Sequence, residues 1–216
     1  HFGCVATPLD AGWELAVLPP NAARRPQDLP ARLDWHPATV PGHAFAVLGR
    51  ADLDEQDVWY RVALSSGPGG QRIRFNGLAT LAEAWLDGVK LLDSESMFLA
   101  QEVALPPGRA LHLRFRALAA PAGLPRPRWR SRFAEPGFLS GLHTTLSGRL
   151  AGQPRNPIVG PWRAVEILTP RPGLPRFPAP RIAATLDPDG TGHLALRLPL
   201  AGHGLPPMPA TLSIAG

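Results

Sequence analysis

The sequence contains one cysteine, Cys4, and one lysine, Lys90. A single cysteine excludes an intramolecular disulfide and any cluster of thiolate metal ligands, so the fold must be held together by packing. Because lysine is almost absent, arginine supplies nearly all of the positive charge, and the arginines are scattered along the chain. A net charge of +5 distributed in this way does not form the concentrated basic patch of a typical nucleic-acid interface.

Long apolar runs are also missing. No apolar segment approaches the roughly 18 residues that a transmembrane helix requires, and no basic leader followed by an apolar stretch indicates a secretory signal. We therefore expect no membrane partner. The chain begins at His1 and not at methionine, so a leader peptide could have been removed. The cellular location of the protein therefore stays undecided between cytoplasm and periplasm.

Proline and glycine are abundant, with 27 and 22 residues, a composition that favours short strands joined by turns. Over 58–64, Val58, Tyr60, Val62 and Leu64 alternate with Trp59, Arg61 and Ala63, and over 72–75 and 111–116 apolar residues alternate with polar ones. This is the period of two expected of a strand with one face on a core. We expect further short strands at 162–168, 182–186 and 193–200. These patterns predict an all-β protein.

The segment 78–86 fits two patterns. Its apolar residues recur at the 3, 4 and 7 spacing of an amphipathic helix, yet 82–87 also alternates like a strand. Asp87-Gly88 is a good hairpin turn leading into 89–92. This turn favours the strand, and we expect Trp59 and Trp85, both inside strands, to be packing residues.

A proline-rich linker predicts a domain boundary. The run from Pro170 through Pro180 contains five prolines, and such a run is stiff and extended. About three strands follow it, around an Asp187-Pro188-Asp189-Gly190 turn, too few for an independent sandwich. We therefore expect a first domain at 1–172 and, at 173–216, the linker with an incomplete second domain that begins near Arg176.

Several segments together resemble one family. They are Trp13, 40–42 (VPG), 57–61 (DVWYR), 75–80 (FNGLAT), 82–88 (AEAWLDG), 94–98 (SESMF) and 160–165 (GPWRAV). In order and spacing, over residues 10–170, the chain resembles the N-terminal, sugar-binding domain of β-mannosidase-like family 2 glycoside hydrolases. The resemblance implies an antiparallel jelly-roll, galactose-binding-like β-sandwich, followed by an immunoglobulin-like domain that would be truncated here, and then by a catalytic barrel.

The same resemblance places the chemistry outside this chain. Retaining glycosidases use two carboxylates about 5 Å apart, and in this family both belong to the barrel. We therefore expect this chain to have no catalytic residue, no cofactor and no activity alone. Its partners would be the downstream catalytic domain and, through the parent enzyme, a carbohydrate.

One loop departs from the family pattern. β-Mannosidases carry a Trp-Asp-Trp-Gly-Pro loop that reaches the catalytic pocket, whereas 142–149 here reads LHTTLSGR. This difference argues against assigning the mannose specificity of β-mannosidases to this chain. We select five residues as candidates for the rim of a substrate pocket or for an interface with the catalytic domain. They are Arg130, Arg132, His143, Arg149 and Trp162.

Three other interpretations remain open. Arginines at 126, 128, 130 and 132 around Trp129 could form a nucleic-acid groove, although we favour a solvated or domain-packing face. The acidic stretch 52–57 resembles the start of a calcium loop, but it lacks the glycine and the glutamate that such a loop needs at its sixth and twelfth positions. The histidines have no zinc-site spacing, so we expect no metal. Finally, the chain could be a stand-alone lectin-like module.

Overall fold

The computed structural model describes residues 3–65, 67–118, 154–171 and 181–197. The chain divides into two compact units, one spanning Thr7–Leu168 and the other comprising His1–Ala6 with Thr169–Gly216. Among the described residues no helix is long and apolar enough to cross a membrane. The assignment of 1–172 and 173–216 to two kinds of domain stays a prediction.

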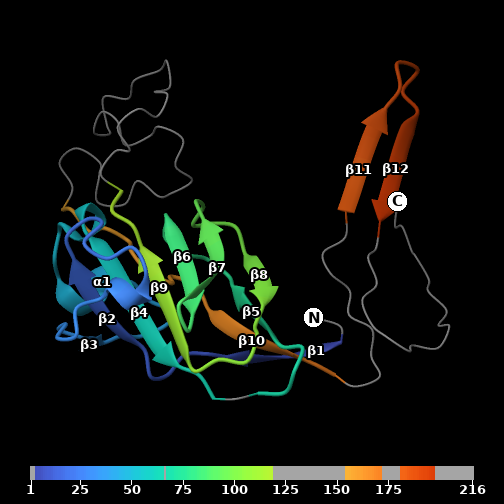
Figure 1. Ribbon diagram of the computed structural model, residues 1–216. Coiled ribbons are helices and arrows are strands. Elements are labelled where there is room, and N and C mark those ends of the chain that lie inside the picture. The colour runs from blue at the N-terminus through green and yellow to red at the C-terminus, as the bar shows by residue number, and fades with distance from the viewer. Residues whose placement is uncertain (1–2, 66, 119–153, 172–180, 198–216) are drawn as a thin grey trace. The chain divides into compact units, whose positions relative to one another are not determined.

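Two sheets form a β-sandwich (Figure 1). The larger sheet has the order β3-β2-β4-β9-β6-β7 and the smaller β1-β10-β5-β8. Neighbouring strands with a defined register are antiparallel. The strands are β1 (Cys4–Pro8), β2 (Glu14–Leu18), β3 (His36–Pro37), β4 (Asp57–Ala63), β5 (Arg72–Phe75), β6 (Ala82–Leu86), β7 (Val89–Ser94), β8 (Gln101–Ala104), β9 (Ala110–Phe115) and β10 (Val165–Pro170). The predicted antiparallel sandwich is confirmed.

In the part of the chain that the structure describes, helical structure is confined to short connections. These are the 3₁₀ turns η1 (Pro26–Asp28) and η2 (Leu53–Glu55) and the five-residue helix α1 (Ala44–Leu48). The helix ends at Gly49, whose φ of 65° is left-handed and therefore suits glycine.

The core lies between the sheets and includes alternate residues of the central strands, such as Val58, Tyr60 and Val62 in β4. Tyr60 in the middle of β4 is fully buried and makes edge-to-face contacts with Trp13 and Phe115, at centroid distances of 6.5 and 5.5 Å. Burial raises the pKa of the Tyr60 hydroxyl. The period-two segments of the sequence thus become the strands that face this core.

A second apolar cluster covers the outer face of the larger sheet. Trp59 and Trp85 are buried there together with Leu18 and Ala23, so the expectation that both tryptophans are packing residues is confirmed. Because β6 has this cluster on one face and the main core on the other, all five of its residues are buried. Burial on both faces explains why its sequence is apolar enough to imitate a helix.

The predicted hairpin turn connects β6 to β7. Asp87 and Gly88 both have positive φ, 46° and 86°, the conformation of a type I′ turn. The Asp87 carboxylate also accepts the backbone N–H groups of Arg109 and Ala110, at 3.0 and 2.9 Å. A single residue therefore shapes the turn and fixes the entry to β9.

One predicted strand is shorter than expected. The strand expected at 162–168 begins only at Val165. Pro161 has no N–H to contribute to a ladder, and the Trp162 indole N–H donates instead to the backbone oxygen of Met97, at 2.8 Å. Trp162 therefore belongs to a loop.

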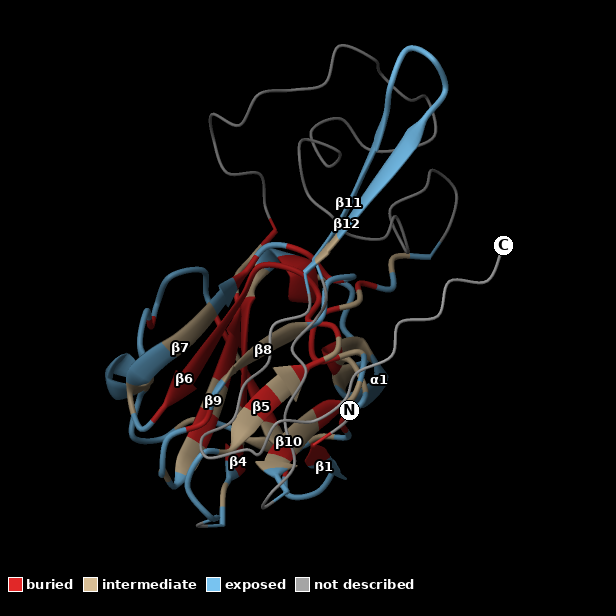
Figure 2. Ribbon diagram, turned by 90° about the vertical axis from the view of Figure 1, so that its right-hand side faces the viewer, coloured by how far each residue is buried: buried red, intermediate tan, exposed pale blue. Residues whose placement is uncertain are grey.

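The second unit contains a hairpin of β11 (Arg181–Leu186) and β12 (Gly192–Arg197). Its turn has the predicted form, since Gly190 has a φ of 87° and donates its N–H to Asp187. Figure 2 shows both strands as almost wholly exposed. The apolar side chains of Ile182, Leu186 and Leu194 are 64%, 74% and 56% exposed.

Candidate functional site

Long connections gather at one end of the sandwich, which we call the loop end. There β4 and β6 begin and β9 ends, because Val58 and Ala82 both lie opposite Phe115. β5 ends at the same place, since the short segment 76–81 joins it to β6. All five candidate rim residues fall in the connection from β9 to β10, which leaves and rejoins the sandwich at this end. Arg130, Arg132, His143 and Arg149 lie outside the described residues.

Trp162 is the candidate that the structure describes. Its indole N–H is bound to Met97, and its ring meets the Phe98 ring edge-on, with centroids 6.2 Å apart and planes at 86°. The Arg163 guanidinium lies 4.2 Å from the centre of the indole ring, a cation–π arrangement. We call Phe98, Trp162 and Arg163 the aromatic–arginine cluster.

Gly77 makes room for this cluster. A Cβ atom at this position would lie 2.7 Å from the Trp162 ring nitrogen and 2.9 Å from the Met97 oxygen. Both distances are shorter than real Cβ contacts, so a larger residue would force the Trp162 ring or the Met97 backbone to shift. Position 77, in the FNGLAT segment, is therefore glycine because the loop that carries Trp162, distant in sequence, approaches it closely.

The cluster presents an apolar and cationic surface to solvent. Phe98 and Leu99 are 48% and 59% exposed, and Arg163 is exposed beside them. Trp162 is only partly exposed, has Arg163 over its ring and uses its N–H within the protein. It is therefore suited to positioning Phe98 and Arg163, which are the side chains available to a partner.

Arginines engage the acidic stretch before β4. Asp52 pairs with Arg50 at 2.7 Å, Asp54 and Glu55 with Arg155 at 3.1 and 2.6 Å, and Asp57 with Arg114 at 2.7 Å. The arginine beside Asp52 lowers the pKa of that carboxyl. Within the described residues no three His, Cys, Asp or Glu side chains group so as to hold a metal ion. The acidic residues of this stretch are therefore explained as members of ion pairs.

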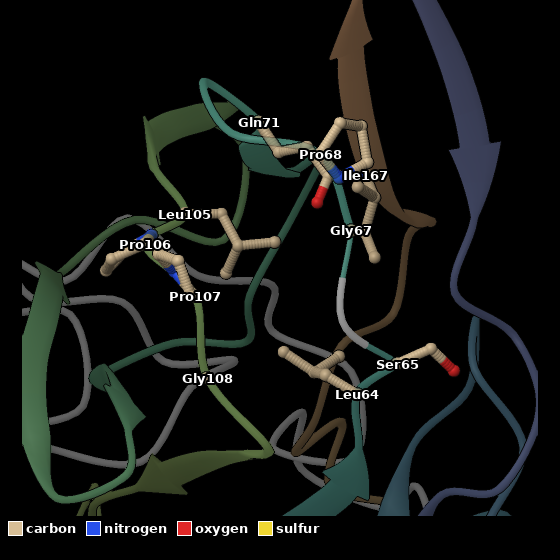
Figure 3. A pocket seen from close by; sticks show the side chains of 10 residues that line it. All are labelled: Leu64, Ser65, Gly67, Pro68, Gln71, Leu105, Pro106, Pro107, Gly108 and Ile167. Atoms are coloured by element: carbon tan, nitrogen blue, oxygen red, sulfur yellow. The ribbon is translucent and has the colours of Figure 1, made fainter.

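A small hollow lies at the end opposite the loop end (Figure 3). Leu64, Leu105 and Ile167 lie around it, with Gln71 and the prolines of two loops at its edge. Its volume is about 20 Å³, enough for one water molecule and far below a drug-sized ligand site of about 300 Å³. It cannot hold a sugar.

A larger, open hollow of about 330 Å³ lies beside β2. Val17, Leu33 and Leu48 form its apolar part and Asp34, His36 and Arg50 its polar part. These polar groups already pair locally, since His36 lies 3.3 Å from Asp34 and Arg50 binds Asp52 in a bidentate manner. Their hydrogen-bonding capacity is partly used, and nothing in this hollow converges on a ligand position.

Solved structures share this fold. A GH2 β-galacturonidase from Eisenbergiella tayi bound to glycerol matches with a TM-score of 0.54 and 14% sequence identity. A β-glucuronidase from Faecalibacterium prausnitzii matches at 0.58 and 19%, and a β-D-mannosidase from Dictyoglomus thermophilum at 0.55 and 18%. No family model matches the sequence, and no curated protein matches it.

The matches cover nearly all of this chain and a minor part of the others. They include 92%, 91% and 90% of the chain but 29%, 36% and 26% of the three enzymes. The described sandwich therefore has the fold of an N-terminal domain of the family 2 glycoside hydrolases, and the predicted resemblance is confirmed. At these identities the comparison establishes the fold alone.

Sequence reasoning selected Trp162 and missed its partners. Phe98 and Arg163 both fall in segments that carry the resemblance, but nothing in a linear pattern shows that residues 98 and 162 touch. Sequence reasoning also missed the link between Asp54 and Arg155, 101 residues apart. The only available signal was an acidic stretch in a chain rich in arginine.

Proposed function

We propose that this chain is the non-catalytic N-terminal part of a β-glycosidase of the β-mannosidase-like, retaining type. One observation supports the proposal most strongly: glycosidases of this fold match over at least 90% of the chain but over 26–36% of their own length. The neighbours act on uronic acids and on mannose by their names, so the parent's sugar is a separate question. The parent would hydrolyse a β-linked sugar.

We propose that both catalytic carboxylates lie outside this chain. A retaining mechanism needs one carboxylate free to attack and another able to donate a proton. The carboxylates of the stretch before β4 are instead bound by arginine guanidinium groups. Such ion pairs suit a structural role, since the carboxylate oxygens are engaged by charge-assisted hydrogen bonds within the domain.

We further propose that the loop end faces the catalytic domain. An exposed phenylalanine beside an arginine is typical of protein interfaces, where aromatic residues and arginine are enriched. The aromatic–arginine cluster offers this combination next to the connection that carries Arg130, Arg132, His143 and Arg149. The exposed apolar side of the β11–β12 hairpin supports a second proposal, that 173–216 begins an immunoglobulin-like domain.

Activity measurements test the main proposal. The purified 216-residue chain and its full-length parent would be compared on aryl β-mannoside, β-glucuronide and β-galacturonide substrates. We expect turnover by the parent and none by the chain. Turnover by the chain that survives controls for contaminating enzymes, or a gene that encodes no barrel, would contradict the proposal.

Calorimetry separates this proposal from a stand-alone lectin-like module. Because ligand sites bury most of a small ligand, we expect the chain to bind mannose, galactose and glucuronic acid weakly or not at all. An affinity tighter than about 10 μM, near −7 kcal/mol, would favour the lectin-like module instead.

A further inference from the structure

Asp54 contacts the chain on both sides of the segment 119–153. On one side the N–H of Leu118 donates to the backbone oxygen of Asp54, at 2.6 Å. On the other side the Arg155 guanidinium donates to the Asp54 carboxylate, at 3.1 Å. Residues 118 and 155 are the stems through which the chain leaves and rejoins the loop end, and one residue binds them both.

The site of attachment is itself fixed to the core. Asp54 is the middle residue of η2, and the preceding Leu53 is fully buried in the main core. Asp54 is itself only 3% exposed. The short turn η2 therefore attaches the stems to the core directly before β4.

Neighbouring contacts strengthen each stem. On the exit side the N–H of Ala117 donates to the Asp57 carboxylate, at 3.0 Å. On the return side Arg155 also binds Glu55, at 2.6 Å. Both extra partners lie within three residues of Asp54, so η2 and the start of β4 together hold the two stems.

Because the Asp54 carboxylate is buried, the loss of an ion-pair partner at this position affects stability. Removing one partner of a buried ion pair costs several kcal/mol in general, because the remaining charge is left uncompensated. Arg155 is about one-third exposed, at 31%, which reduces that cost. The return stem is therefore bound to a carboxylate that is almost fully buried.

We propose that Asp54 is a positioning residue that joins the exit and return stems of the segment 119–153. Both stems are then held as one unit: loosening the return stem at Arg155 also loosens the exit stem at Leu118. The functional consequence rests on the proposed function. Four of the candidate rim residues lie between these stems in sequence, so Asp54 would fix the two points at which the segment that carries them joins the sandwich.

Amide hydrogen exchange followed by NMR on the 216-residue chain tests the proposal. The variants are Asp54→Asn, which keeps the backbone oxygen that Leu118 binds, and Arg155→Met. We expect the Leu118 amide to exchange about tenfold faster in both, the effect of losing one charge-assisted hydrogen bond. The amide of Val62, in the central strand β4, should keep its rate.

Arg72→Met is the matched control. Arg72 is 27% exposed and binds Glu102 at 2.6 Å in the smaller sheet, away from both stems. Its loss should leave the exchange of Leu118 unchanged. If Asp54→Asn does not fold, Arg155→Met and the milder Arg155→Lys test the same link through the exchange rate of the Leu118 amide.

Two results would overturn the proposal. An unchanged Leu118 rate in the Arg155 variants would show that the two stems are held independently. Equal acceleration of Leu118 and Val62 would show that Arg155 supports global stability and not the stems. The experiment uses neither sugar nor activity, so its outcome is separate from that of the proposed function.

Discussion

Arg114 and Asp57 form an ion pair inside the larger sheet. The Nε and Nη2 atoms of Arg114 both donate to one Asp57 carboxylate oxygen, at 3.1 and 2.7 Å, and the side chains are 4% and 2% exposed. Asp57 also accepts the N–H groups of Asn21, at 2.9 Å, and Ala117, at 3.0 Å. The pair therefore connects β4 and β9 with the loop that covers the outer face and with the loop end.

Breaking this pair should be costly. We expect Arg114→Met or Asp57→Asn to lower the free energy of unfolding by about 3–5 kcal/mol, because a buried charged group loses its principal ion-pair partner. Urea unfolding measures this change. Arg50→Met, which removes an ion pair whose side chains are 47% and 42% exposed, should cost about 1 kcal/mol or less. Equal losses in the two ion pairs would contradict the prediction.

Gly160 should not tolerate a side chain. It has a φ of 138°, and a Cβ atom there would lie 2.5 Å from the Tyr60 hydroxyl oxygen. We expect Gly160→Ala to cost about 2–4 kcal/mol through overpacking and backbone strain. Gly49→Ala has a positive φ but nothing within 4 Å, so about 1–2 kcal/mol is expected there.

A double mutant separates the two causes at Gly160. In the Gly160→Ala background, Tyr60→Phe removes the clashing oxygen and should restore part of the lost stability. The coupling is measured as a double-mutant cycle by chemical denaturation. Strictly additive effects would indicate that backbone strain alone is responsible.

Stability should fall as the pH drops from 7 to 5. Burial, helped by the positive charge of Arg61, lowers the pKa of His112, while Asp87 opposes this effect. The unfolded histidine, with a pKa of about 6.5, then binds its proton first as the pH falls, so the neutral form stabilises the fold above that value. Burial lowers the pKa of His43 in the same direction.

Replacing His112 tests the origin of this pH dependence. Because His112→Gln cannot titrate, the unfolding free energy of the variant should depend less on pH between 7 and 5 than that of the unchanged chain. Adding His43→Gln should flatten the dependence further. Identical slopes for all three proteins, measured by urea unfolding at each pH, would show that neither histidine contributes.

Local patterns predicted several of the strands and two of the turns, but not β1, β2, β3 or β8. Period-two alternation located β4, β5 and β9, and Asp87-Gly88 identified the β6–β7 hairpin, because side-chain alternation and left-handed turn geometry depend on neighbouring residues only. The strand expected from Trp162 starts three residues late, since the hydrogen bond of Trp162 to Met97 is not local.

The sequence by itself determined the fold class and the segments that carry the family resemblance. Only the tertiary structure decided which loops meet at the loop end, as in the contact of Phe98 with Trp162 and the binding of Leu118 and Arg155 by Asp54. The physical reason is sequence distance: these partners are 64 to 101 residues apart, and only the packing of two sheets brings the strand ends that carry them together.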